Sequence, residues 1–145
     1  MSTIVITGCS SGFGLQAALA FARNGDKVYA TMRNPERSKS LLAAAATENL
    51  NIHIKQLDVN KSDTYNAVFD EIIKESNTID VLVNNAGILR AGAFEDLSET
   101  MIREVVETNL FAPLFLSKAV LPYMRKQKSG YIIMISSLSG IAGLP

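Results

Sequence analysis

Thr7-Gly8-Cys9-Ser10-Ser11-Gly12-Phe13-Gly14 is the stretch of sequence that decides the fold. It follows the short apolar run 3–7 and precedes apolar residues at helical spacing, so it predicts a tight turn from a strand into a helix. Small residues at such a turn let the backbone approach a pyrophosphate, and the helix N-terminus offers N–H donors and the positive end of its dipole. A turn that needs glycines only for its backbone geometry is the alternative. We expect phosphate contacts from Thr7, Gly8, Ser10, Ser11, Gly12, Phe13 and Gly14.

Short apolar runs alternate with segments of helical periodicity along the chain. This alternation predicts an α/β fold, a doubly wound parallel sheet whose crossover helices cover both faces. We expect one dinucleotide-binding domain over residues 1–145, with strand order three-two-one-four-five. The expected strands are 3–7, 27–32, 52–57, 81–83 and 131–136, which are rich in β-branched or aromatic residues. The expected helices lie around 15–22, 38–46, 65–73, 99–107 and 110–125, with Ser98 as an N-cap and Pro113 in an opening turn.

Charge and cysteine content exclude several classes of function. The 14 Lys and Arg balance the 14 Asp and Glu, so no basic excess is available for nucleic acid or an anionic membrane. Cys9 is the only cysteine, which excludes an internal disulfide framework and a zinc site built on paired cysteines. No apolar run reaches membrane-spanning length, and no secretory signal pattern is present. We expect a cytoplasmic protein without a metal, in which Cys9 packs as a small side chain and His53 faces solvent.

Four further segments follow the glycine loop in a consistent order. Asp58-Val59 closes the third expected strand, Asn84-Asn85-Ala86-Gly87 closes the fourth, Asn109 lies in a helical stretch, and Ser137 follows the fifth strand. Together with the spacing Gly-x-x-x-Gly-x-Gly after Thr7, they resemble the classical short-chain dehydrogenase/reductase (SDR) family along the whole chain. Locally, the sequence is most similar to the hydroxysteroid and retinol dehydrogenase branch. The glycine spacing disfavours the sugar-modifying branch.

The resemblance implies a Rossmann fold, incomplete at its C-terminal side, and an oxidoreductase that interconverts a small alcohol and a ketone or aldehyde. It also implies that Asn109 supports a water relay and that Ser137 orients the substrate. Taken singly, Asn109 could equally be a residue at the start of a helix, and Ser137 could be a residue at the end of a strand. The site roles are favoured because all the motifs occur in the same order as in the family. The cofactor contacts implied beyond the glycine loop are Asp58, Val59, Asn85, Ala86 and Gly87.

The residues after the second expected strand favour NADP(H) as cofactor. A dinucleotide fold places this point beside the adenosine ribose, where a carboxylate binds the 2′-hydroxyl and an Arg accommodates a 2′-phosphate. Met32-Arg33-Asn34 offers no carboxylate, and Arg33 has a permanently charged guanidinium group that can bind a phosphate through two N–H donors. A solvated charge at a strand end is the alternative for Arg33, and NAD(H) stays possible. Arg37 and Lys39 are interpreted as part of a solvated helix face.

The acid/base pair of the SDR family is missing from these 145 residues. In the family a Tyr acts as acid or base and a Lys four residues later lowers its pKa, but no Tyr-x-x-x-Lys occurs here. The favoured interpretation is that these residues are part of a longer enzyme. The alternative is a truncated product, a regulatory remnant that only binds dinucleotide. We expect residues 1–145 alone to be inactive. We also expect homo-oligomers, because the apolar strand 131–136 would present an unpaired edge.

Overall fold

The fold is built on one parallel sheet. The computed structural model describes residues 1–142. The strands are β1 (Thr3–Thr7), β2 (Lys27–Met32), β3 (Ile52–Gln56), β4 (Val81–Asn84) and β5 (Tyr131–Met134). They lie in the order β3-β2-β1-β4-β5, and every neighbouring pair is parallel. The predicted α/β class and strand order are therefore confirmed.

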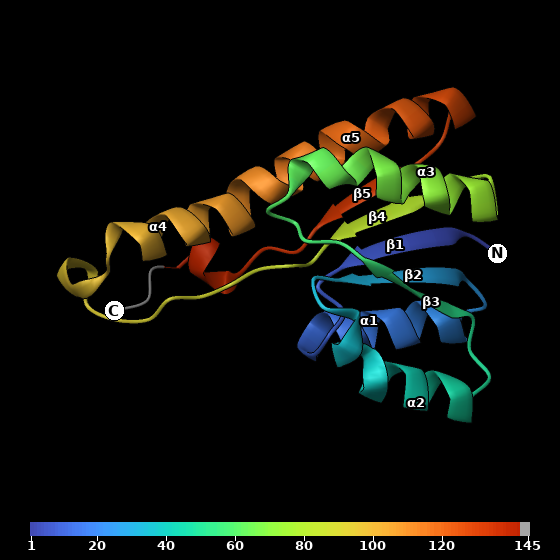
Figure 1. Ribbon diagram of the computed structural model, residues 1–145, viewed down its shortest axis with the longest axis horizontal. Helices are drawn as coiled ribbons and strands as arrows, with labels where there is room; N and C mark the ends of the chain where they lie inside the picture. The colour runs from blue at the N-terminus through green and yellow to red at the C-terminus, as the bar shows by residue number, and fades with distance from the viewer. Residues whose placement is uncertain (143–145) are drawn as a thin grey trace.

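Helices cover both faces of the sheet. They are α1 (Gly12–Arg23), α2 (Lys39–Thr47), α3 (Tyr65–Ser76), α4 (Glu99–Val106) and α5 (Ala112–Gln127). Figure 1 shows α1 and α2 on one face and α3 and α5 on the other. Successive side chains of β1 point to opposite faces of the sheet and pack against different helix layers. Ile4 belongs to the apolar cluster that contains Ala18 of α1, and Val5 belongs to the cluster that contains Phe69 of α3. Every residue of β1 is buried, as expected for a strand covered on both faces.

Residues 99–127 form one continuous helix, which corrects the prediction of two separate helices. α4 leads into five residues of π-helix, η4 (Glu107–Phe111), and η4 leads into α5. A π turn closes i→i+5 hydrogen bonds, and it ends at Phe111, two residues before Pro113, which donates no N–H. Pro113 does lie in the opening turn of α5, as predicted. Ser98 caps α4 as predicted, since its Oγ accepts from the Met101 N–H at 3.2 Å.

Smaller differences from the predictions have local causes. His53 is half-buried rather than solvent-facing, because its ring stacks on that of Tyr29 at 5.2 Å. Burial, and then the charge of Lys27, lower the pKa of His53. The third and fifth strands end at Gln56 and Met134, before the predicted 57 and 136. The short helical turns are η1 (Pro35–Ser38), η2 (Ser62–Thr64), η3 (Phe94–Asp96) and η5 (Leu138–Gly140).

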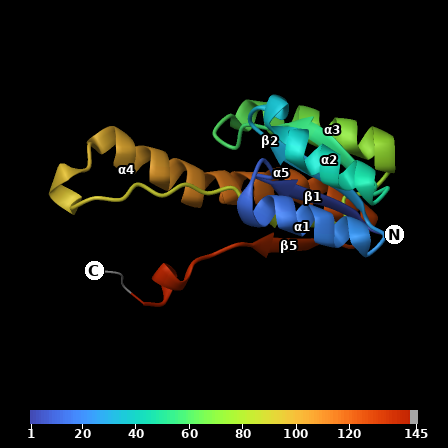
Figure 2. The same ribbon diagram turned by 90° about the horizontal axis from the view of Figure 1, so that it is seen from below.

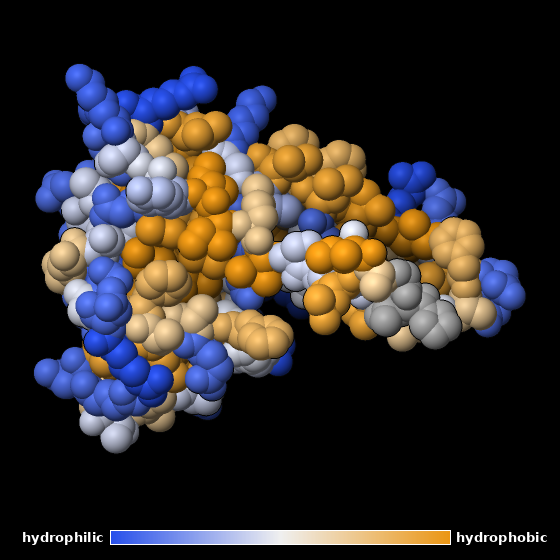
Figure 3. Space-filling model, turned by 180° about the vertical axis from the view of Figure 1, so that it is seen from behind, coloured by the Kyte–Doolittle hydropathy of each residue, from blue (hydrophilic) through white to orange (hydrophobic). Residues whose placement is uncertain are grey.

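β5 is the least covered strand of the sheet. It forms one edge, and the chain runs on from it to η5 away from the helices (Figure 2). Large apolar side chains stay exposed here, among them Tyr131 at 74% and Ile135 at 52%. Figure 3 shows a broad apolar surface on this side of the molecule. Within residues 1–142, none of the helices is both long and apolar enough to cross a membrane.

Candidate dinucleotide-binding site

A large cavity of about 810 Å³ opens at the carboxyl ends of the strands. The loop between β1 and α1 forms its floor, and the segments that follow β2, β3 and β4 contribute the walls together with α4 and η4. Parallel sheets bind ligands at this end, because the loops and helix N-termini converge there. The predicted site residues that line the cavity are Gly8, Ser10, Ser11, Phe13, Gly14, Arg33, Asp58, Val59, Asn85, Ala86 and Gly87.

The glycine loop has the geometry of a phosphate cradle. Gly8 and Gly12 adopt φ angles of 75° and 58°, in the left-handed region where a side chain is strained. A Cβ on Gly12 would meet nothing within 4 Å, so the loop is open on this side. Ser11 makes no side-chain cap to α1, and no acidic residue lies in the first turn. The first amides and the positive dipole end of α1 are therefore available to an anion.

Two of the loop glycines are required by close packing. A Cβ on Gly8 would lie 2.9 Å from the Cα of Ala86. A Cβ on Gly14 would collide with the backbone oxygen of Gly8 and would come within 2.5 Å of Asn85 Nδ2. Atoms at these distances overlap, so a side chain at either position would push the glycine loop away from the end of β4.

Thr7 joins the ends of β1 and β4 from beneath the cavity. Its hydroxyl accepts from the backbone N–H groups of Asn85 and Ala86, both at 3.0 Å, and donates to the Val83 carbonyl at 3.4 Å. The Asn85 side chain donates a hydrogen bond from Nδ2 to the Thr7 carbonyl at 2.9 Å. Thr7 is 1% exposed and does not line the cavity. The structure therefore gives Thr7 a positioning role behind the site, and Gly12 also lies outside the lining.

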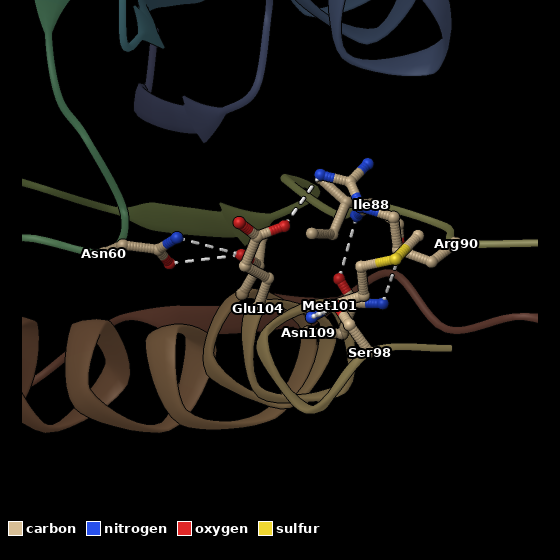
Figure 4. A network of polar contacts seen from close by, with 8 residues as sticks. Asn60, Ile88, Arg90, Ser98, Met101, Glu104 and Asn109 are labelled. Atoms are coloured by element: carbon tan, nitrogen blue, oxygen red, sulfur yellow. Dashed lines mark hydrogen bonds and ion pairs between the residues drawn. The ribbon is translucent and has the colours of Figure 1, made fainter. Parts of the chain in front are cut away.

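Asn109 holds the segment after β4 in place. Its Oδ1 accepts from the Ile88 N–H at 2.9 Å, and its Nδ2 donates to the Ile88 carbonyl at 2.8 Å. Figure 4 shows this side chain directed at Ile88 from η4. The π turn carries Asn109, so the widening of the helix and the anchoring of Ile88 occur at the same place. A Cβ on Gly87 would lie 3.4 Å from Asn109 Oδ1, which leaves little space for another residue there.

Two further polar contacts tie the long helix to the cavity walls (Figure 4). Asn60 and Thr108 exchange side-chain hydrogen bonds at 3.0 and 3.2 Å. Arg90 forms an ion pair with Glu104 at 2.8 Å, and both residues line the cavity. These pairs were missed by sequence reasoning, because 48 and 14 residues separate the partners. The lining residues that the sequence did not single out as site residues are Met32, Asn34, Arg37, Leu57, Asn60, Ile88, Arg90, Glu104 and Thr108.

Ser137 and Cys9 lie apart from the cavity lining. Ser137 begins the η5 turn after β5, and its Oγ accepts from the Ser139 N–H at 3.2 Å. Among the described residues, no hydrogen bond joins Ser137 to Asn109. Cys9 is fully buried behind the glycine loop, as predicted, and burial raises its pKa to about 12. A thiol with this pKa is protonated at neutral pH and is a poor nucleophile. Residues 1–142 contain no cluster of metal-ligating side chains.

The doubly wound parallel sheet and the glycine loop before α1 define a Rossmann-like α/β protein. The chain belongs to the short-chain dehydrogenase family, whose model matches residues 2–145. It is 42% identical over 143 residues to the uncharacterized oxidoreductase YusZ of Bacillus subtilis, covering 97% of this chain and 50% of that protein. It is 41% identical to human retinol dehydrogenase 8, covering 98% of this chain and 46% of that protein.

A solved structure shares the same fold. The crystal structure of actinorhodin polyketide ketoreductase with NADPH superposes with a TM-score of 0.92 at 29% identity. The match covers 99% of this chain and 56% of that chain. The chain spans about half the length of the curated relatives it matches. The sheet described here therefore corresponds to part of the SDR fold, as the resemblance implied.

Proposed function

We propose that the protein is an NADP(H)-dependent oxidoreductase that interconverts an alcohol and a ketone or aldehyde. The observation that carries this proposal is the cavity rim after β2, where Arg33 and Arg37 line the cavity and no carboxylate follows the strand directly. An acidic residue at this point would bind a ribose 2′-hydroxyl, whereas an arginine suits a 2′-phosphate. The relative solved with NADPH agrees with this choice.

The residues of the cavity suit the other parts of a dinucleotide. The open glycine loop and the uncapped N-terminus of α1 would bind the pyrophosphate, with Ser10 and Ser11 as additional donors. Asp58 and Val59 would contact the adenine, and Asn85, Ala86 and Gly87 would support the nicotinamide half. A bound nicotinamide would supply or accept the hydride.

Two side chains are assigned to the chemistry of the substrate carbonyl. We assign Ser137 to a hydrogen bond with the reacting oxygen, where charge develops during hydride transfer. We assign Asn109 to the support of a water relay. Its two bonds to Ile88 fix the position of η4, which carries Asn109. The proton itself requires an acid or base that residues 1–145 do not offer in a Tyr-x-x-x-Lys arrangement.

Arg33→Asp is expected to reverse the cofactor preference. A charge-assisted contact to the 2′-phosphate contributes on the order of tenfold to a hundredfold in affinity. The full-length variant should therefore lose about that factor for NADP⁺ and not for NAD⁺. Fluorescence titration of both cofactors measures the change, and Arg125→Asp on α5, outside the cavity lining, is the control for altered net charge. An unchanged preference would mean that Arg33 does not contact the phosphate.

Residues 1–145 produced alone are expected to bind NADP(H) without turning over alcohols or carbonyls, because the acid/base tyrosine is missing from them. Mass-verified protein assayed for cofactor absorbance change, with binding measured in parallel, tests this expectation. Binding without turnover also fits the second candidate function, a non-catalytic dinucleotide-binding protein. Turnover by this chain would overturn the expectation and would show that another group transfers the proton.

We also propose a cytoplasmic location and a homo-oligomeric state. The single buried cysteine suits a reducing compartment. The exposed apolar side chains of β5 and of the long helix, Leu110 and Leu114 among them, provide surface for a second copy.

A further inference from the structure

The turn that follows β2 has a fixed conformation. Asn34 caps η1 by accepting from the Glu36 N–H at 3.0 Å, and its carbonyl accepts from the Arg37 N–H at 3.1 Å. Ser38 Oγ donates to the Pro35 carbonyl at 2.6 Å, and Pro35 itself restricts φ at the first position of the turn. The backbone under Arg37 is therefore held by contacts within the turn.

The charged residues of the turn differ in whether they line the cavity. Arg33, Asn34 and Arg37 line the cavity, whereas Glu36 lies outside the lining, and all four residues are exposed. Among residues 1–142, Arg33 and Arg37 belong to no ion pair, although Arg23, Arg90 and Arg103 are each paired with a glutamate. Two arginines of one turn thus line the cavity, and neither has an ion-pair partner among the described residues.

The acidic residues that line the cavity are engaged elsewhere. Glu104 is paired with Arg90 at 2.8 Å. Asp58 accepts from the Asn60 N–H at 3.1 Å at the end of β3. Neither carboxylate forms an ion pair with Arg33 or Arg37 in the described part of the chain. The corner at η1 therefore carries two arginines that no described carboxylate pairs with, an arrangement that suits an anion with several acceptor oxygens.

We propose that Arg37 is a specificity-determining residue that binds the same phosphate monoester as Arg33. The inference rests on the proposed function and extends it, since it assigns the second cation of the site to a residue that sequence reasoning placed on a solvated helix face. A phosphate monoester carries about −1.5 to −2 charges at neutral pH and has three acceptor oxygens. Two planar guanidinium forks neutralise and satisfy such a group better than one.

The test is calorimetric binding of two nucleotides to the full-length protein. Adenosine 2′,5′-bisphosphate carries the 2′-phosphate, and adenosine 5′-monophosphate lacks it. Arg37→Gln should weaken binding of the bisphosphate roughly tenfold and leave that of the monophosphate unchanged. Lys39→Gln is the matched control. Lys39 lies two residues after Arg37, is exposed and does not line the cavity, so its replacement removes one positive charge outside the site. It should change either affinity by less than about twofold, since exposed charges are screened by salt.

Further variants separate the possible outcomes. Arg37→Lys should recover part of the lost affinity, because it restores the charge without the planar fork. If Arg37→Gln behaves like Lys39→Gln while Arg33→Gln loses bisphosphate affinity, the assignment of Arg37 is wrong and the proposed cofactor stands. Equal weakening of both nucleotides by Arg37→Gln would also overturn it, because that result indicates a distorted turn. A wild-type protein that does not prefer the bisphosphate would instead contradict the NADP(H) proposal itself.

Discussion

Thr7→Val is expected to destabilise the fold by about 2–6 kcal/mol, because two partly buried N–H groups lose their acceptor and each such loss costs about 1–3 kcal/mol. The hydroxyl of Thr7 is the acceptor for the N–H groups of Asn85 and Ala86, and valine has the same shape without that oxygen. The new methyl group would also crowd the two N–H groups, whose nitrogens lie 3.0 Å from the hydroxyl oxygen, so lost hydrogen bonds and crowding both contribute to the effect. Nucleotide affinity should fall as well, since Asn85 and Ala86, which follow β4, line the cavity.

Thr31→Val is the matched control for this prediction. Thr31 lies opposite Thr7 in the register of β1 and β2, and it is also fully buried. Its hydroxyl has no hydrogen-bond partner within the described residues. Replacing an unsatisfied buried hydroxyl by a methyl group should be neutral or stabilising. Urea unfolding of the two variants compares them directly, and equal losses of stability would show that the Thr7 hydroxyl has no special role.

Gly8→Ala is expected to lower the free energy of unfolding by about 2–5 kcal/mol. Part of this, about 1–2 kcal/mol, is the strain of a side chain at the left-handed φ of 75°. The remainder, about 1–3 kcal/mol, comes from overpacking, because the new Cβ would lie 2.9 Å from the Cα of Ala86. The backbone of β4 cannot rotate away as a flexible side chain would, so the glycine loop must move.

Gly25→Ala separates these two contributions. Gly25 has a similar φ of 87°, but a Cβ there would meet nothing within 4 Å. The variant should therefore show only the backbone strain, about 1–2 kcal/mol. Denaturant unfolding and nucleotide titration of both variants test the comparison. The packing explanation fails if Gly8→Ala is no less stable than Gly25→Ala or if it binds nucleotide normally.

Local sequence patterns were sufficient for the architecture. Strands covered on both faces read as continuous apolar runs, and helices that cover a sheet show apolar residues three and four apart. Both patterns depend on neighbours within a few positions, so the strands and the helix α1 behind the glycine loop could be predicted, and the strand order followed from the doubly wound class that they indicate. The cap of α4 by Ser98 was predictable for the same reason, because the donor is only three residues away.

The long helix shows where local reasoning was wrong. Pro113 was expected only in the opening turn of a second helix, because proline removes an N–H and its ring disfavours the preceding α turn. The chain forms the π turn η4 instead and continues as one helix. In that turn Asn109 satisfies both backbone polar groups of Ile88, which lies 21 residues away. Neighbouring residues could not indicate this contact, since it depends on how the helix packs against the end of β4.

The sequence by itself determined the fold class and the glycine loop, because both depend on residue types at short, regular spacings. The strand order followed from the doubly wound class, and the family from the order of the motifs along the chain. Tertiary structure alone decided which side chains meet. It placed Thr7 behind the cavity and not in its lining, through bonds to residues 78 and 79 positions away. It also placed Arg37, which is exposed as expected, in the lining of the cavity. The direction of a side chain depends on turn geometry and on packing between distant segments, and neither is encoded in periodicity.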